Sequence, residues 1–270
     1  MSDALEHVRL GRIDESFHQV AAAVVEEVLL RLGHTVEMSE ESHPVMYPRL
    51  RDGEIDLFAD AWLPHGHEVY WEQVHEQVVE IAALYHDALF FWAVPAAIPE
   101  DVVGSLHDLA KPEVIARMTT QVVQGTKPSA GLSMRSDRLL VEYGLDELGW
   151  THPPGDINSV VDTVNRRMTA GDWFVTPLWQ PMFLNEVHDL RALADPLGIF
   201  PPPDRASLLA HREAYARLPH RTREVLGRIQ YTVGDVNAMD LSVALDELDP
   251  LDAARRWMDE HDDQVQNWLA

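Results

Sequence analysis

The N-terminal part of the chain alternates between strand and helix patterns, and this constrains the fold more than any other feature. Residues 8–10 and 35–38 are predicted to form short strands. Between them, apolar side chains recur at spacings of three and four over residues 17–32, which predicts a helix. Gly33 follows, where a helix can end in a left-handed conformation. A strand, a helix and a strand in so short a segment predict parallel strands with a right-handed crossover.

The same alternation continues along the chain and predicts an α/β protein with two lobes. The expected fold has mainly parallel sheets flanked by helices, with a ligand cleft between the lobes. Clusters of proline mark the places where the chain passes from one lobe to the other. We therefore expect lobe I to comprise residues 1–95 and 196–270, and lobe II residues 96–195. Further strands are predicted at 55–62, 90–94, 120–124, 173–178 and 190–194, and helices at 67–77, 131–143, 157–168, 221–226, 236–245 and 251–269.

Composition excludes several functional classes. The formal net charge is −24 and the chain has only two lysines, Lys111 and Lys127, so a nucleic-acid partner is not expected. With no cysteine, it has no disulfide, thiolate nucleophile or cysteine-ligated metal. The longest apolar stretch, residues 88–98, is well short of the roughly 20 residues that span a bilayer, so membrane insertion is not expected. No sequence feature requires a cofactor.

The strand predicted at residues 55–62 ends in a combination that suits a positively charged ligand. Side chains alternate along a strand, so Asp60 and Trp62 are expected on one face, together with Asp56 and Phe58. In open α/β sheets, ligands bind beyond the carboxyl ends of the strands. The alternative interpretation is that Trp62 only caps the core of its lobe.

A second strand, at residues 173–178, is also followed by a tryptophan. Trp179 is expected to face Trp62 across the cleft, whereas Trp173 fits a core position at the start of the strand. Two indoles can form a box for a quaternary ammonium group, which has no hydrogen to donate. The negative ring faces supply the attraction instead, up to ~2 kcal/mol per desolvated contact.

Several motifs, in this order along the chain, resemble the glycine betaine/choline-binding components of ABC importers. They are Leu-Gly at residues 10–11, Asp-Ala-Trp-Leu-Pro at 60–64 with Tyr-Trp at 70–71, Ala-Gly at 130–131, and Thr-Pro-Leu-Trp-Gln-Pro at 176–181. The resemblance extends from residue 8 to about residue 268. It implies a type II periplasmic-binding-protein-like fold that closes on its ligand, an aromatic cage around a trimethylammonium group, and delivery to a permease.

By this resemblance, Trp62 and Trp179 match cage tryptophans. A loop at Gly11, Arg12 and Ile13 matches one whose backbone amides meet a ligand carboxylate. Two positions depart from the family pattern: Arg12 stands where an aromatic residue is common, and Ser129 replaces the first glycine of a Gly-Ala-Gly loop that continues as Ala130 and Gly131.

These departures leave the ligand open between a zwitterion and a cation. Arg12 can pair with a ligand carboxylate, which favours a betaine, or remain solvated. Asp60 favours a net cation such as choline, unless Arg12 or the backbone neutralises it. The candidate ligands are glycine betaine, choline, carnitine and proline betaine. The candidates for a third cage wall are Phe17, Tyr85, Phe91 and Trp92.

The sequence therefore predicts a binding protein and not an enzyme, with a small quaternary-ammonium ligand and an importer permease as partners. The N-terminus shows no secretory signal. The protein is expected in the periplasm or outside the cell if a signal was removed, and in the cytoplasm if Met1 is the start. In the second case it would be a cytosolic sensor of a small zwitterion. A metal-assisted hydrolase using Asp60, His65 and His67 is the third alternative. No metal site is predicted, because His65, His67 and His75 are expected on a surface helix.

Overall fold

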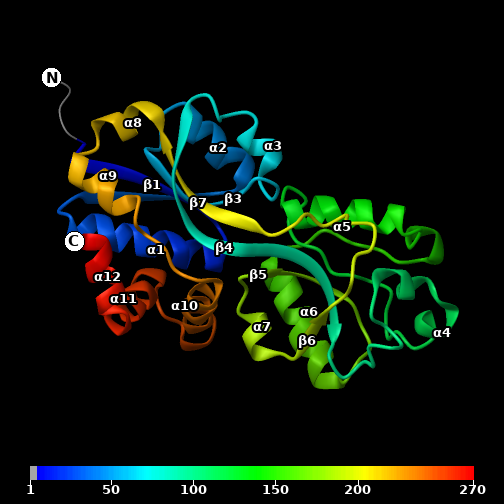
Figure 1. Ribbon diagram of the computed structural model, residues 1–270. Coiled ribbons are helices and arrows are strands. Elements are labelled where there is room, and N and C mark those ends of the chain that lie inside the picture. The colour runs from blue at the N-terminus through cyan, green and yellow to red at the C-terminus, as the bar shows by residue number, and fades with distance from the viewer. Residues whose placement is uncertain (1–4) are drawn as a thin grey trace. The chain divides into compact units, whose positions relative to one another are not determined.

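The computed structural model describes residues 5–270, which divide into two compact units (Figure 1). Unit 1 contains the described residues up to Ala88 together with Pro203–Ala270, and unit 2 contains Leu89–Pro202. Both connections between the units are single stretches of chain, the first of them inside strand β4 (Val78–Pro95).

Unit 1 is built on a mixed sheet in the order β2-β1-β3-β7-β4. The predicted strand–helix–strand unit is confirmed, because β1 and β2 pair in parallel and the connecting helix α1 is followed by Gly33 at φ 87°. β3 also pairs in parallel with β1. The bounds are β1 (His7–Ile13), α1 (Ser16–Arg31), β2 (Thr35–Glu41), β3 (Leu57–Leu63) and β7 (Asp204–His211).

The parallel arrangement does not extend over the rest of the sheet. β7 runs antiparallel to both β3 and β4, so the prediction of mainly parallel strands is right only for β1, β2 and β3. β7 was not predicted because it follows the run of prolines at residues 201–203 directly. β4 starts at Val78, earlier than the strand predicted at residues 90–94, and its first part is mostly half-buried.

Helices cover the sheet of unit 1. α1 is mostly buried and packs against α10 and α11, and Glu27 of α1 accepts hydrogen bonds from Arg31 and from Arg255 of α11. α2, with a proline at its start and Pro48 inside it, was not predicted. The helix predicted at residues 67–77 is only the four-residue α3. The bounds are α2 (His43–Arg51), α3 (Glu68–Trp71), α8 (Arg212–Arg217), α9 (His220–Leu226), α10 (Val233–Asp246), α11 (Pro250–Glu260) and α12 (Asp262–Leu269).

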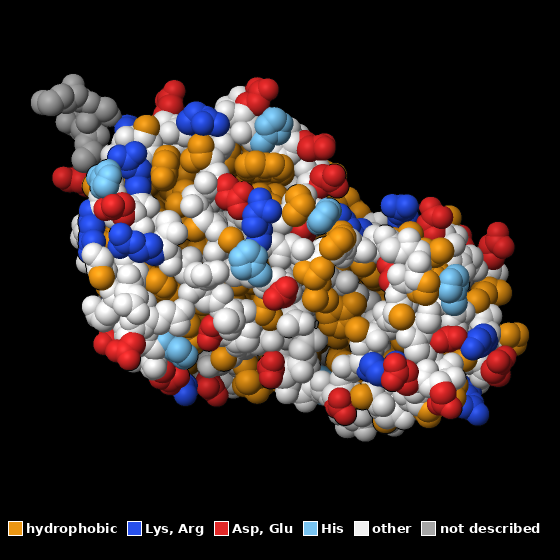
Figure 2. Space-filling model, in the orientation of Figure 1, with side chains coloured by type: hydrophobic (Ala, Val, Ile, Leu, Met, Phe, Trp, Pro, Cys, Tyr) orange, Lys and Arg blue, Asp and Glu red, His pale blue; other side chains and the backbone are white. Residues whose placement is uncertain are grey.

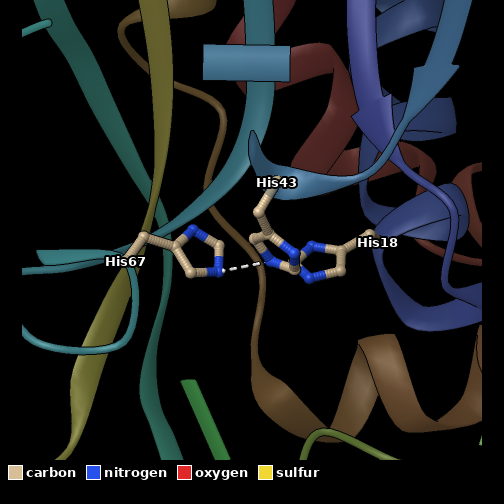
Figure 3. A group of neighbouring side chains, drawn as sticks. All are labelled: His18, His43 and His67. Atoms are coloured by element: carbon tan, nitrogen blue, oxygen red, sulfur yellow. Dashed lines mark hydrogen bonds between the residues drawn. The ribbon is translucent and has the colours of Figure 1, made fainter. Parts of the chain in front are cut away.

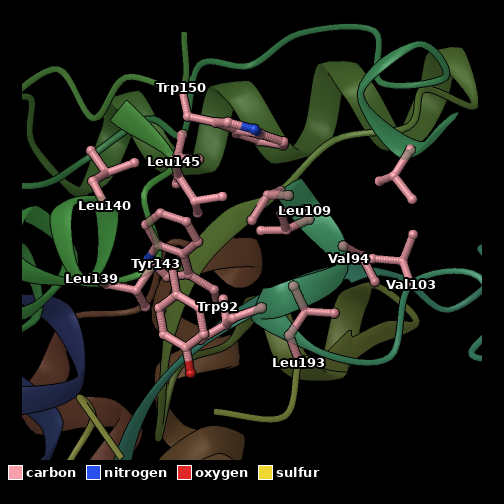
Figure 4. Close-up of a cluster of buried hydrophobic side chains, with 14 of the residues drawn as sticks. Trp92, Val94, Val103, Leu109, Leu139, Leu140, Tyr143, Leu145, Trp150 and Leu193 are labelled. Carbon is pink, nitrogen blue, oxygen red and sulfur yellow. The ribbon is translucent and has the colours of Figure 1, made fainter. Parts of the chain in front are cut away.

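Unit 2 has a small antiparallel sheet, in which the last part of β4 pairs with β5 and β6. Its apolar core includes Trp92, Tyr143 and Trp150 (Figure 4). The strand predicted at residues 120–124 is reduced to a single bridge between Val122 and Thr151. The bounds are η1 (Leu106–Ala110), α4 (Pro112–Ile115), α5 (Gly131–Glu142), η2 (Asp146–Leu148), α6 (Ile157–Ala170), β5 (Thr176–Gln180), α7 (Leu184–Val187) and β6 (Leu190–Ala192).

The surface carries the excess of acidic residues in a dispersed form. On the face shown in Figure 2, acidic and basic side chains are interspersed. Many are paired, as in the bidentate contact between Arg205 and Glu80. Within residues 5–270, no helix is both long enough and apolar enough to cross a membrane.

Candidate ligand-binding site

Trp62 lies near the carboxyl end of β3, where the sequence placed a ligand site. Its side chain is buried in unit 1, and its indole N–H donates to Asp60 Oδ1 at 3.2 Å and to Tyr85 Oη at 3.0 Å. Tyr85 belongs to β4, on the far side of β7 in the sheet order. Because two acceptors hold the same N–H, the orientation of the indole ring is fixed by side chains of two different strands.

The backbone at Asp60 departs from a regular strand. Its φ is 71°, a left-handed value that is rare outside glycine, asparagine and aspartate, and the β3–β7 register shifts between Phe58 and Ala61. The strict alternation predicted for β3 is therefore interrupted, and every residue of the strand is buried. Bulges of this kind often lie next to functional sites, where they redirect a side chain.

Asp60 is completely buried and is paired with a histidine. Its Oδ2 lies 2.6 Å from His18 Nδ1, on the first turn of α1. The hypothesis that Arg12 neutralises Asp60 is wrong, because the Arg12 guanidinium donates to Glu40 Oε2 at 2.8 Å. The resulting ion pair holds Arg12 at the edge strand β2, which contains Glu40.

Three buried tyrosines surround this carboxylate. Burial raises the pKa of Tyr85 well above its usual value, and the negative charge of Asp60 raises it further. The same two causes, in the same order, raise the pKa of Tyr47 and of Tyr231. All three hydroxyls therefore stay protonated at neutral pH and remain neutral in the field of Asp60.

Of the four candidates for a third aromatic wall, two contact Trp62. The ring of Phe17 lies 5.5 Å from the Trp62 ring at an angle of 52°, and Tyr85 is the hydrogen-bond partner described above. Trp92 lies instead in the core of unit 2, where its N–H donates to Ser136 Oγ at 2.9 Å. Phe91 is half-buried on β4 and pairs with Leu178.

The sequence predicted a loop at Gly11, Arg12 and Ile13. In the structure, these residues form the last part of β1. It pairs with the end of β2 in parallel register. A side chain at Gly11 would collide with the sulfur of Met46 and lie 3.1 Å from Ile55 Cγ2. Close packing beneath the strand therefore accounts for this glycine.

His67 was expected on a surface helix, and this is wrong. Its ring is buried and lies near parallel to that of Trp62, with 6.5 Å between the centroids. The turn that carries it is held by Asp204, which accepts hydrogen bonds from the backbone amides of His65 and Gly66 at 2.9 and 2.6 Å. Asp204 also lies 2.9 Å from His65 Nδ1. His75 is exposed.

Three further residues line this part of unit 1 and were not predicted from the sequence: His18, His43 and Tyr47. The ring of His18 lies 6.1 Å from that of Trp62, and His43 and Tyr47 both contact His67. The one available signal was the position of His18 directly after Phe17 at a helix start. His43 and Tyr47 lie on α2, which was not predicted as a helix.

In unit 2, Trp179 is buried on β5 and pairs with Phe90 of β4. Its carbonyl oxygen accepts a hydrogen bond from Asn185 Nδ2 at 2.9 Å, and the same amide donates to Met182 at 3.0 Å. As at Trp62, a proline with a cis peptide bond follows two positions later. Trp173, expected in the core, is half-buried and packs against the apolar cluster of unit 2.

The Ala-Gly pair of unit 2 opens a helix, as predicted. Ala130 is the N-cap of α5 and Gly131 its first residue. The amide of Ala130 donates to the carbonyl of Lys127 at 2.9 Å, which closes the preceding turn. The helix start provides backbone N–H groups that can meet an anionic group.

Comparison with known proteins identifies the family. The sequence model of one protein family, the substrate-binding domain of ABC-type glycine betaine transport systems, matches residues 6–260. The chain belongs to this family. Its members are solute-binding proteins of the periplasm or cell exterior, and they are not enzymes.

Individual relatives are distant in sequence. The chain is 23% identical over 146 residues to the glycine betaine/carnitine transport binding protein GbuC of Listeria monocytogenes serotype 1/2a (strain 10403S), which covers 54% of this chain and 48% of that protein. The match thus spans about half of that relative. Lactococcal OpuAC, in its closed form with glycine betaine, superimposes with a TM-score of 0.87 at 21% identity, covering 98% of this chain and 100% of that chain. A choline-binding protein in complex with choline superimposes with a TM-score of 0.85 at 19% identity, covering 98% of this chain and 92% of that chain. These likenesses confirm the type II binding-protein fold.

Proposed function

We propose that this protein is the substrate-binding component of an ABC importer for a small quaternary-ammonium compound, glycine betaine or choline. Trp62 and Trp179 each contribute an aromatic face to the ligand. The observation that carries the proposal is the environment of Trp62: its N–H is already occupied by Asp60 and Tyr85, so what the indole has left to offer a ligand is its π face. A group without hydrogens to donate is the ligand that such a face suits best.

Charge supports the same ligand class. A fully buried carboxylate, that of Asp60, lies directly beside the Trp62 indole, and burial strengthens its attraction for a cation. The pairing of Asp60 with His18 moderates this charge without removing the preference. Arg12 is engaged by Glu40, so the proposal does not assign it to a ligand carboxylate.

Unit 2 supplies the second half of the proposed site. Trp179 ends a strand as Trp62 does, and the start of α5 at Ala130 and Gly131 offers amides for a carboxylate of a zwitterionic ligand. A ligand that both indoles contact stabilises the arrangement of the units in which both reach it. Delivery of that form to a membrane permease on the outer side of the membrane completes the proposed role.

Calorimetric titration of Trp62→Ala and Trp179→Ala with glycine betaine and choline tests the proposal. Each substitution is expected to weaken binding of the preferred ligand by up to roughly 30-fold, because one desolvated contact contributes up to about 2 kcal/mol. Trp173→Ala is the matched control and should retain affinity. Unchanged affinity in both test variants, with the wild type binding, would show that the indoles do not form the site.

A further inference from the structure

Three histidines from separate segments of unit 1 converge on one point. His18 lies in the first turn of α1, His43 is the first residue of α2, and His67 directly precedes α3 (Figure 3). One ligand atom of each ring lies within 4.8 Å of the others, and the residues are only 1%, 5% and 3% exposed. Side chains with this chemistry are seldom buried in a group without a ligand or a complete set of hydrogen bonds.

Neighbouring groups fix the direction of the rings. His67 Nδ1 accepts a hydrogen bond from the Trp62 amide at 3.1 Å and lies 2.9 Å from Tyr47 Oη. His67 Nε2 therefore faces His43 Nε2, at 3.0 Å. On the other side of the cluster, Asp60 Oδ2 lies 2.6 Å from His18 Nδ1. A carboxylate or hydroxyl behind an imidazole is the usual support of a metal-binding histidine.

From this arrangement we propose that His18, His43 and His67 bind a divalent transition-metal ion such as Zn²⁺. Imidazole nitrogens suit zinc, copper and nickel. Two nitrogens on one tetrahedral Zn²⁺, with bonds of about 2.0–2.1 Å, lie roughly 3.3 Å apart, so the His43–His67 spacing needs to open only by a few tenths of an ångström. Three imidazoles leave a fourth position for water. The proposal does not depend on the proposed function.

The hydrogen bonds also indicate which proton a bound metal ion displaces. Since the Trp62 amide donates to His67 Nδ1, the proton of a neutral His67 lies on Nε2, between the two rings. A metal ion on Nε2 takes the place of that proton, which passes to Nδ1, where the Tyr47 oxygen accepts it. The Trp62 amide then gives up its acceptor, so metal binding is coupled to the backbone at Trp62.

Titration of the metal-free full chain with Zn²⁺ alone, in competition with a chromophoric chelator, tests the site. The expected result is one tightly bound ion per chain, weakened at least roughly tenfold in His43→Ala and by a comparable factor in Tyr47→Phe, which removes the support of His67. The control is His220→Ala, an exposed histidine on α9 paired with Glu224, and it should retain the affinity of the wild type. Thermal unfolding of each variant verifies that it is folded.

A second measurement needs no variant. The visible absorption of the Co²⁺-loaded wild type distinguishes a four-coordinate site, which we expect, from a six-coordinate surface site. The absence of stoichiometric binding, affinity unchanged in both His43→Ala and Tyr47→Phe, or a six-coordinate spectrum would overturn the proposal. None of these results bears on betaine binding, which the tryptophan variants test separately.

Discussion

The strand ends that carry Trp62 and Trp179 have the same local sequence pattern, a tryptophan followed two residues later by proline, but they are held in different ways. The Trp62 indole is fixed by side chains, through the hydrogen bonds of its N–H to Asp60 and Tyr85. At Trp179, the backbone contributes contacts, because the residue pairs with Phe90 and its carbonyl accepts a hydrogen bond from Asn185.

In the proposed site, this difference means that the two ends contribute differently to recognition. The Trp62 end gathers a carboxylate, three histidines and buried tyrosines, so its ring position depends on charge and hydrogen bonding. The Trp179 end depends on strand geometry. Polar substitutions near Trp62 should therefore alter both stability and ligand affinity, whereas loss of the Asn185 contact should alter stability alone.

The largest effect is expected at Asp60. Asp60→Ala removes the partner of His18 and one acceptor of the Trp62 N–H, and it places alanine at φ 71°. Breaking a buried pair in this way typically costs about 3–5 kcal/mol. Asp60→Asn keeps an acceptor and tolerates the left-handed backbone, so this variant should lose clearly less stability than Asp60→Ala. Urea unfolding measures both, and equal losses would contradict the role given to this carboxylate.

Gly11→Ala tests how tightly unit 1 is packed beneath β1, next to the strand that carries Trp62. The new methyl group meets the sulfur of Met46, which is fully buried. Overpacking of this kind costs about 1–3 kcal/mol. The double variant with Met46→Ala creates space for the methyl group, so the cost of the Gly11 substitution should be smaller in that background. A cost that is the same in both backgrounds would show that the collision is not the cause.

Tyr85→Phe and Asn185→Ala compare the two ends directly. Each removes hydrogen bonds to one tryptophan, and each should lower the free energy of unfolding by about 1 kcal/mol. Only Tyr85→Phe should also weaken binding of the proposed quaternary-ammonium ligand, because it frees one side of the Trp62 indole. A loss of affinity in Asn185→Ala with none in Tyr85→Phe would reverse the comparison.

The smallest effect concerns acid stability of unit 1. Glu80 of β4 and Arg205 of β7 form a bidentate pair that joins the two strands. The hydrogen bonds from Arg205 hold the pKa of Glu80 below its ordinary value of 4.5. A depressed pKa stabilises the folded state above about pH 4.5, and the contribution is lost as pH falls below it. Glu80→Gln should lower stability at pH 7 by at most about 1 kcal/mol and flatten the decline in acid. An acid profile identical to that of the wild type would contradict the shift.

Part of this architecture follows from the sequence alone. The helix at residues 16–31 and its flanking parallel strands were predicted because apolar periodicity and Gly33 agree. β7 and α2 were missed because prolines adjoin or interrupt them, and local patterns cannot show that tertiary packing overrides these breaks.

The residues of the candidate site could be predicted only where they lie in one segment. Asp60 and Trp62 stood out because they end a single strand, and Phe17 because it opens a helix. The histidine cluster joins three segments whose proximity depends on α2 and on the turn held by Asp204. The bulge at Asp60, which turns its carboxylate toward His18, also has no signature in the sequence.

Removing the methyl groups of the ligand one by one tests the central claim most directly. In calorimetric titrations of the wild type with glycine betaine, dimethylglycine, sarcosine and glycine, recognition by aromatic faces predicts that affinity falls with each methyl group lost and that glycine binds weakest. Equal or tighter binding of glycine would show that hydrogen bonds to the amine, and not the indoles of Trp62 and Trp179, select the ligand.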